Sequence, residues 1–294
     1  MAPGPAAAAK ALSSVLSIDS PPRPAVAWIT EIALTEQWFA SRADAEEAAA
    51  KWERAFRDRL RRDHNELTAL GRVCIHAFNS SSEYMVQGAA FIEEGRDSDE
   101  LKAVKRRRAR FQVYLAALVQ LTPTDFEAMS RGILALLGVA APKLTPRSGD
   151  EGIDFYGQLL LEDLLPRVEA MPDVYRRLSV WMIGQAKHYQ ATQVATPDIR
   201  ELVGAIDLAR GGAYGGAGTK YQDLGILVCD PVFYLFFTTG KISTDGWRLL
   251  ERSGVIGMDG EMVAAFLADQ GVGVENDVFV EGRLGDWLGE YKEP

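Results

Sequence analysis

The order of helical and extended segments after residue 121 is the feature that most restricts the fold of this chain. The spacing of apolar residues there changes repeatedly between the three- or four-residue helical period and short apolar runs typical of buried strands. In order, we expect a helix at 125–137, strands at 152–161 and 179–188, a helix at 197–210, a strand at 232–238, a helix at 244–252, a strand at 255–258 and a helix at 261–269. Helices interleaved with strands build an α/β domain, so the predicted fold is a mixed β-sheet flanked by helices.

The chain before residue 121 is predicted to be helical. From 43 to 70, Trp52, Phe56 and Leu60 recur every four residues, and a second long helix is expected at 97–120. The start of the chain is rich in Ala, Pro and Ser and contains no compact apolar block, which indicates a disordered leader rather than a signal peptide. The predicted organisation is a leader at 1–27, an α-helical N-terminal domain at 28–120, the α/β domain at 121–270 and a C-terminal tail at 271–294.

The charge balance bears on possible nucleic-acid partners. The chain carries 41 acidic and 32 basic residues, a formal net charge of −9, whereas domains that bind DNA are usually basic. The basic residues are unevenly distributed, with one cluster at 54–62 and another at 102–110 that includes Lys102 and Arg106. Each cluster has two interpretations, a solvated helix face or a phosphate-binding surface, and Lys102 and Arg106 are candidates for the second.

Cysteine usage and hydropathy indicate the compartment. Cys74 and Cys229 are far apart in apolar surroundings, and we expect two buried thiols in a reducing compartment. No segment approaches the roughly 20 apolar residues of a membrane span. The chain is therefore predicted to be cytoplasmic, without a membrane partner.

Two short strings carry the chemistry expected of the α/β domain. Asp154 follows a Gly-rich acidic turn, 149–152, and enters an apolar strand, where a carboxylate needs a cation, a salt bridge or a helix N-terminus as partner. Gln185 and Lys187 are two residues apart on the next strand, so their side chains point to one face. Carboxylate and amide oxygens suit a hard divalent cation, and a lysine can orient a water and balance charge on a phosphodiester. The set predicts a metal-dependent nuclease.

Two further residues have competing interpretations. Glu127 adds a carboxylate at the start of the 125–137 helix, but with Thr124 it also forms a capping-box pattern, in which it satisfies only a backbone N–H. His188 is adjacent to Lys187 and is a candidate contact for a DNA phosphate. The histidines and cysteines have no metal-ligand spacing among themselves. The Gly-rich stretch at 211–220 lacks the residue order of a phosphate loop and is predicted to be a flexible loop.

Five short stretches between about Leu121 and Leu267 carry a resemblance to a known family. They are Asp125–Glu127, Ser148–Asp154, Gln185–Lys187, Pro197–Gly204, and Phe236–Gly240 with Ser243. In this order they resemble the catalytic domain of Mrr-type restriction endonucleases, within the PD-(D/E)xK nuclease superfamily. Gln185–Lys187 stands where other branches of that superfamily carry an acid-x-Lys.

The resemblance implies a restriction-endonuclease-like mixed sheet and Mg²⁺-dependent cleavage of DNA, with Mn²⁺ able to substitute. Asp154 would then be the metal carboxylate, Gln185 its partner, Lys187 the catalytic lysine and Glu127 a supporting acid. A restriction or anti-phage role follows, with a homodimer or larger oligomer, because two strand cuts need two sites, and with a defence-system protein as a further partner.

The sequence departs from the family in two places and leaves two alternatives open. The Gly-rich stretch at 211–220 and residues 224–229 lengthen the connection before the strand at 232–238. The stretch between Asp154 and Gln185 is longer than usual, and 158–178 is predicted to be a largely helical insertion. The acidic charge leaves open a catalytically inactive protein that uses the nuclease fold to bind DNA or a partner. A repair or junction-resolving nuclease is the other alternative.

Overall fold

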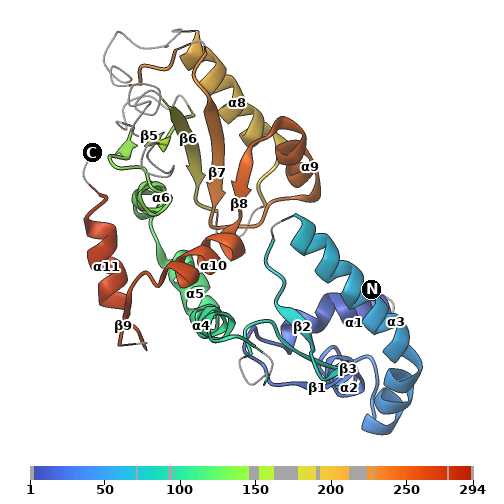
Figure 1. The fold of residues 1–294 in the computed structure, drawn as a ribbon. Helices are drawn as coiled ribbons and strands as arrows, with labels where there is room; N and C mark the ends of the chain where they lie inside the picture. The colour runs from blue at the N-terminus through green and yellow to red at the C-terminus, as the bar shows by residue number, and fades with distance from the viewer. Residues whose placement is uncertain are drawn as a thin grey trace, which may run out of the picture. The chain divides into compact units, whose positions relative to one another are not determined.

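The computed structural model describes residues 3–70, 72–91, 95, 97–145, 152–161, 178–189, 193–211, 224–227, 229–276 and 278–292. The chain divides into two compact units, Met1–Gln112 and Val113–Pro294, which Figure 1 shows as a ribbon. The predicted Gly-rich loop at 211–220, apart from Gly211, and the acidic turn before residue 152 lie outside the described residues. None of the helices in the described ranges is both long and apolar enough to cross a membrane.

The first unit combines helices with a small antiparallel sheet. Its helices are α1 (Pro5–Ala11), the 3₁₀ turn η1 (Leu12–Ser14), α2 (Ala25–Thr35), α3 (Arg42–Ala69) and α4 (Asp99–Arg108). Its strands β1 (Arg23–Pro24), β2 (His76–Asn79) and β3 (Ser82–Gly88) pair in the order β1-β3-β2. The predicted helix at 43–70 is therefore confirmed.

The expected disordered leader is wrong for the segment that forms α1. Ala8 is fully buried and Leu12 nearly so, in the same core cluster as Trp28 and Phe56. Alanine is the best helix former, and its small side chain lets α1 pack closely against α3. The Ala-rich composition, which predicts disorder, here supplies a packed helix.

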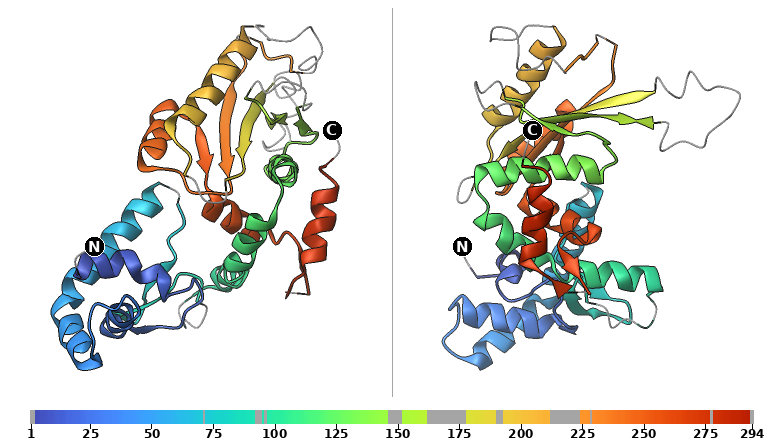
Figure 2. Two further views of the ribbon diagram at one scale, coloured as in Figure 1. Left: turned by 180° about the vertical axis from the view of Figure 1, so that it is seen from behind. Right: turned by 90° about the vertical axis from the view of Figure 1, so that its left-hand side faces the viewer.

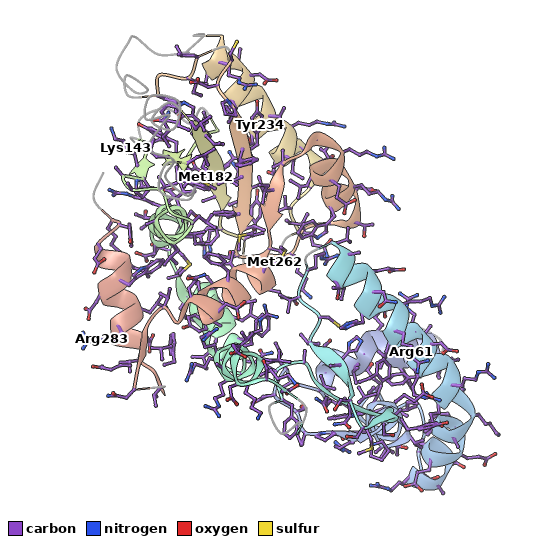
Figure 3. The ribbon with its side chains drawn as sticks, in the orientation of Figure 1. Arg61, Lys143, Met182, Tyr234, Met262 and Arg283 are labelled. Atoms are coloured by element: carbon purple, nitrogen blue, oxygen red, sulfur yellow. The ribbon has the colours of Figure 1, made fainter. Side chains whose placement is uncertain are left out.

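The basic cluster of α3 is engaged in ion pairs. Arg57 is 8% exposed, lies 3.4 Å from Glu83 and places its guanidinium 4.3 Å from the centre of the Tyr84 ring. Arg61, labelled in Figure 3, also pairs with Glu83, and Arg59 pairs with Asp63 at 2.8 Å. These contacts favour the structural interpretation of this cluster over a phosphate-binding one.

The helix predicted at 97–120 is two helices, α4 and α5 (Phe111–Gln120). The chain leaves the helix between Arg108 and Phe111, within the densest run of basic residues, where Arg106 and Arg110 would stand four apart and repel each other. Lys102 and Arg106 lie on α4, in the first unit, and Lys102 pairs with Asp99 at 3.7 Å.

The second unit is built on a five-stranded mixed sheet in the order β4-β5-β6-β7-β8. Its elements are α6 (Pro123–Leu136), β4 (Lys143–Leu144), β5 (Phe155–Leu160), β6 (Ser179–Lys187), α8 (Thr196–Arg210), β7 (Val232–Thr238), α9 (Thr244–Ser253), β8 (Ile256–Met258) and α10 (Gly260–Gln270). Strands β4, β5 and β6 are antiparallel neighbours, whereas β6, β7 and β8 run parallel. The predicted mixed sheet flanked by helices, preceded by a helical region, is confirmed.

Helices cover both faces of this sheet. Trp181 and Ile183 of β6 share a buried cluster with Ile199 and Leu202 of α8, and α9 contributes Trp247 to the same cluster. On the other face, Leu159 of β5 approaches Gly138 at the end of α6. Figure 2 (right) shows α6 (green) and α8 (gold) on opposite sides of the sheet, and Figure 3 labels Met182 and Tyr234 on the adjacent strands β6 and β7.

The predicted insertion at 158–178 is corrected at its start. Gln158, Leu159 and Leu160 belong to β5 and pair with Trp181, Val180 and Ser179 of β6. The connection between the two strands therefore begins after β5, and residues 162–177 lie outside the described residues.

The segment expected as a tail, 271–294, contains folded elements. They are β9 (Val274–Glu275), β10 (Val278–Phe279) and α11 (Glu281–Gly289). Helix α11 packs on α6. The Trp287 indole rests directly on the α6 backbone at Gly132, where an added Cβ would lie 2.6 Å from the indole ring. Lys292 adds an ion pair of 2.8 Å to Asp125 at the start of α6. The C-terminal segment thus supports the helix that carries Glu127.

We expect Trp287→Ala to destabilise the second unit by about 2–3 kcal/mol, somewhat less than for a fully buried tryptophan, because the indole is half-buried on Gly132. Urea unfolding of the full chain, followed by circular dichroism, measures the loss. Asp286→Ala, at an exposed position of the same helix, is the control and should change the stability by less than about 0.5 kcal/mol. Equal effects of the two substitutions would contradict the packing role.

The two cysteines differ from expectation. Cys74 is half-buried, and burial raises the pKa of its thiol, so that it stays protonated at neutral pH. Cys229 is exposed, because it lies outside the strands in the connection that precedes β7. The prediction of two buried thiols is thus wrong for Cys229.

Candidate active site

The carboxyl ends of the parallel strands β6 and β7 bring the predicted site residues to one edge of the sheet. In open α/β sheets, ligands bind beyond this end of the strands. Lys187, the last residue of β6, stands opposite Thr238, the last residue of β7, and Thr239 N donates to Lys187 O at 3.3 Å. The arrowheads of both strands lie at the same edge in Figure 1.

Asp154 is fixed to β6 by its side chain as well as by its backbone. Its N–H donates to Gly184 O at 2.9 Å, and its Oδ2 accepts from Ala186 N at 2.7 Å. The residue lies one position before β5, not inside it, and is half-buried. Since Tyr156 belongs to the cluster beneath α8 and side chains alternate along a strand, Asp154 faces the same side. A hydrogen-bonded carboxylate is thereby held in one orientation between Gln185 and Lys187.

Gln185 is the polar residue whose burial most needs an explanation. Its side chain is 0% exposed, on the same face of β6 as Ile183, and neither Oε1 nor Nε2 has a hydrogen-bond partner among the described residues. An unpaired buried amide group costs about 1–3 kcal/mol. A cost of this size is expected at a site where a ligand supplies the missing interaction.

Lys187 is held by a residue of α8. Its Nζ lies 3.7 Å from Glu201 Oε2, and the lysine side chain is 21% exposed while that of Glu201 is 46% exposed. Asp154, Gln185 and Lys187 therefore lie together on the face covered by α8. The structure brings these three predicted residues together as expected.

His188 is oriented by Thr239. Thr239 Oγ1 accepts from Tyr189 N at 3.1 Å, donates to Tyr189 O at 3.2 Å and lies 2.9 Å from His188 Nδ1. A hydroxyl has one proton, so all three contacts are satisfied when His188 Nδ1 carries a proton and donates it to Thr239. This leaves Nε2 of His188 for other contacts. Its role in DNA binding remains a proposal.

Tyr189 extends this arrangement to α8. Its hydroxyl donates to Asp198 Oδ1 at 3.0 Å, and Asp198 Oδ2 accepts from Ala195 N at 3.1 Å at the start of the helix. Burial, together with the Asp198 carboxylate, raises the pKa of the Tyr189 hydroxyl. The hydroxyl therefore remains a donor at neutral pH, and the beginning of α8 is tied to the chain segment that follows Lys187.

The capping interpretation of Glu127 is wrong. Helix α6 begins at Pro123, with Thr122 as N-cap and Asp125 as the acid of the capping box: Asp125 N donates to Thr122 Oγ1 at 3.2 Å, and Thr122 N donates to Asp125 Oδ2 at 3.2 Å. A proline at the first helical position explains the earlier start, since its φ is preset and it lacks the N–H that a cap would satisfy. Glu127 is not required as a cap.

Glu127 comes from the other side of the sheet. It is half-buried on α6, next to Phe126, whose ring centre is 6.3 Å from that of His188. Its helix therefore meets the end of β6, but on the face opposite to α8. Of the four predicted catalytic residues, Glu127 is the one that is assigned to the site from the position of its helix.

The donor set at this edge fits a hard divalent cation. The described residues contain no group of three His, Cys, Asp or Glu side chains that could hold a metal ion. An oxygen-preferring cation also accepts amide carbonyls, and the buried Gln185 amide, beside the oriented Asp154 carboxylate, offers such an oxygen. The residues present thus fit Mg²⁺ or Mn²⁺ better than a softer metal.

Residues 118–216, a third of the chain, match the model of the Mrr catalytic domain, which is described as a restriction endonuclease. This segment is similar to the catalytic domain of Mrr-type restriction endonucleases. The match includes α6, β5, β6 and α8, and with them Glu127, Asp154, Gln185, Lys187 and Glu201. It ends before β7, so the predicted resemblance at Phe236–Gly240 lies beyond it. No curated protein matches the chain significantly.

Two solved restriction endonucleases are similar in structure. MspJI, solved in complex with a 27-mer oligonucleotide, is 17% identical, with 68% of this chain and 40% of that chain covered and a TM-score of 0.41. The modification-dependent enzyme AspBHI is 19% identical, with 63% of this chain and 39% of that chain covered and a TM-score of 0.39. This chain thus aligns with about two fifths of each of those proteins.

Glu201 and Thr239 were not identified as site residues from the sequence. Both lie in stretches that resemble the Mrr family, Pro197–Gly204 and Phe236–Gly240, but as components of a helix and a strand end. One available signal was their position beside β6: Thr239 directly follows β7, and Glu201 lies within α8, and both elements pack against β6. Their contacts with Lys187 and His188 depend on tertiary structure.

Proposed function

We propose that this protein is a metal-dependent DNA endonuclease and that its second unit carries the active site. The observation that carries the proposal is the buried Gln185 amide, without a partner among the described residues, beside the oriented carboxylate of Asp154 and the ammonium of Lys187. The match of residues 118–216 to the restriction endonuclease family supports it. A restriction or anti-phage role and a homodimeric assembly are parts of the same proposal.

Asp154 and Gln185 would hold Mg²⁺ or Mn²⁺ from the face covered by α8, and Glu127 would add a further carboxylate from α6, which reaches the end of β6 from the other face. When bound, the metal supplies positive charge to the phosphate and lowers the pKa of a bound water. Asp154 is prepared for this role, because the Ala186 N–H fixes one of its oxygens. The burial of Gln185 keeps bulk water from competing for its carbonyl.

Lys187 acts on the phosphodiester itself. Its ammonium stands at the end of β6, where it stabilises the negative charge that develops on the phosphate during attack and orients the attacking water. His188, whose Nδ1 donates to Thr239, would contact an adjacent phosphate through Nε2 in the doubly protonated form of its ring, because a phosphate oxygen only accepts hydrogen bonds. We assign Lys102 and Arg106, on α4 of the first unit, to further phosphate contacts.

The test is cleavage of plasmid DNA with Mg²⁺ or Mn²⁺. We expect strand breaks with either metal and none in EDTA. A panel of methylated and unmethylated duplex, single-stranded DNA, branched DNA and RNA then defines the substrate. Cleavage confined to branched DNA would favour a junction-resolving enzyme, and cleavage that persists in EDTA would contradict the metal site.

The net charge of −9 favours a second candidate function, a protein that binds DNA or a partner without cleaving it. This candidate predicts binding that is unaffected by EDTA or by Lys187→Ala, together with no cleavage under any metal condition. Gel-shift measurements with and without EDTA, made beside the cleavage panel, separate the two.

A further inference from the structure

Glu201 lies where the chain segments of two catalytic residues meet. Its carboxylate is 3.7 Å from Lys187 Nζ. On its other side, the Glu201 side chain lies close to the backbone that leads to Asp154. A Cβ added to Gly152 would lie 3.5 Å from Glu201 Cγ and 3.2 Å from Ala205 Cβ. Gly152 also has a φ of 77°, a conformation that glycine adopts without strain. The backbone at Gly152, two residues before Asp154, thus passes directly over the helix turn that carries Glu201.

Helix α8 gives Glu201 a fixed platform. Ile199 and Leu202, on either side of Glu201, are fully buried in the cluster beneath the sheet. Three residues earlier, Asp198 accepts hydrogen bonds from the Tyr189 hydroxyl and from the Ala195 backbone. The backbone of α8 at Glu201 is therefore tied both to the core and to the chain that follows Lys187.

We propose that Glu201 is a positioning residue, which holds the ammonium of Lys187 at the end of β6 beside Asp154. This inference rests on the proposed nuclease function and adds a residue to it. A lysine has a flexible four-carbon stem, and a catalytic group displaced by about 1 Å can cost up to about 10²-fold in rate. A carboxylate on a rigid helix restricts the stem without occupying the place of the phosphate.

A partly exposed ion pair of this length contributes little to stability, typically about 0–1 kcal/mol. A structural role for Glu201 is therefore expected to be weak, and loss of its charge should leave the fold intact. Removal of a negative charge near the DNA-binding edge should also leave DNA affinity unchanged or slightly improved. A loss of cleavage rate without a change in stability or DNA affinity therefore distinguishes a positioning role from a structural role and from a general effect of charge on DNA binding.

The experiment compares Glu201→Gln with Glu251→Gln, which removes a carboxylate from an exposed position of α9 in the same unit. We expect Glu201→Gln to lower the single-turnover cleavage rate about tenfold. The Kd for duplex DNA, measured with Ca²⁺ in place of Mg²⁺, and the thermal midpoint should match the wild type. Glu251→Gln should match the wild type in all three measurements.

A wild-type rate in Glu201→Gln overturns the proposal, and so does a parallel loss of rate, affinity and thermal stability, which would indicate a structural role. If the wild-type protein cleaves no DNA, the proposed function is defeated. A second measurement tests the role of Glu201 even in that case. In protein labelled with ¹⁵N-lysine, the ammonium signal of Lys187, assigned by its absence in Lys187→Arg, should shift in Glu201→Gln and not in Glu251→Gln. An unchanged signal would show that Glu201 does not hold Lys187.

Discussion

Lys187→Ala is expected to lower the rate of DNA cleavage by about 10²–10³-fold, the usual cost of removing a group that stabilises transition-state charge. The lysine is the last residue of β6 and is not part of the buried apolar cluster under α8, so the fold should persist after its truncation. Single-turnover cleavage of plasmid DNA with saturating Mg²⁺ measures the rate, and circular dichroism confirms the fold.

Lys241→Ala is the matched control. Lys241 follows β7 at the same edge of the sheet, is 73% exposed and pairs with Glu261 at 3.8 Å. If the effect of Lys187 came only from general attraction of DNA to positive charge, both substitutions would weaken binding and cleavage to a similar degree. The catalytic assignment requires that only Lys187→Ala lowers the rate at saturating DNA. Full activity in Lys187→Ala would defeat the assignment of the site.

The sheet and its order of elements could be predicted because its signals are local. The apolar run at 232–238 is β7 without any shift, and the run at 179–188 is β6 to within one residue. The position of Gln185 and Lys187 on one strand face also follows from local periodicity. Three of the four predicted catalytic residues therefore come together as expected.

The errors arise where the outcome depends on competing local signals or on distant packing. At α6, Thr122 and Asp125 compete with Thr124 and Glu127 for the same capping pattern, and Pro123 favours the earlier start. At the N-terminus, the packing of α1 against α3 decides between a disordered and a helical Ala-rich segment. Glu201 and Thr239 depend on tertiary contacts, which no pattern within their own segments reveals.

The pairing between Asp154 and Ala186 supports the proposal that a Gln at position 185 can act as a metal ligand. Asp154 accepts the Ala186 N–H, so its negative charge lies directly between Gln185 and Lys187. A second carboxylate buried at position 185 would carry a large desolvation cost before a cation arrives. In the proposed site an amide would provide a ligand oxygen at a lower cost, and Asp154 would supply the charge.

Gln185→Met should therefore raise the stability of the second unit by about 1–2 kcal/mol and lower Mg²⁺-dependent cleavage by about 100-fold. The gain follows from the removal of a fully buried amide that lacks partners among the described residues, and methionine has a similar length and flexibility. Each kcal/mol corresponds to about 2–4 °C in the melting temperature of a unit of this size. Thermal and urea unfolding measure the gain, and the plasmid assay measures the loss.

The first unit offers a matched control in Gln87, which is also 0% exposed but accepts a hydrogen bond of 2.8 Å from Asn79 Nδ2. Gln87→Met leaves that donor unpaired, so it should destabilise the first unit by about 1–3 kcal/mol, the opposite sign. The sign of the stability change at these two buried glutamines thus distinguishes an amide that binds a ligand from an amide that stabilises the fold. Destabilisation by Gln185→Met of the same size as by Gln87→Met would mean that the Gln185 amide is satisfied within the protein, and its assignment as a metal ligand would fall.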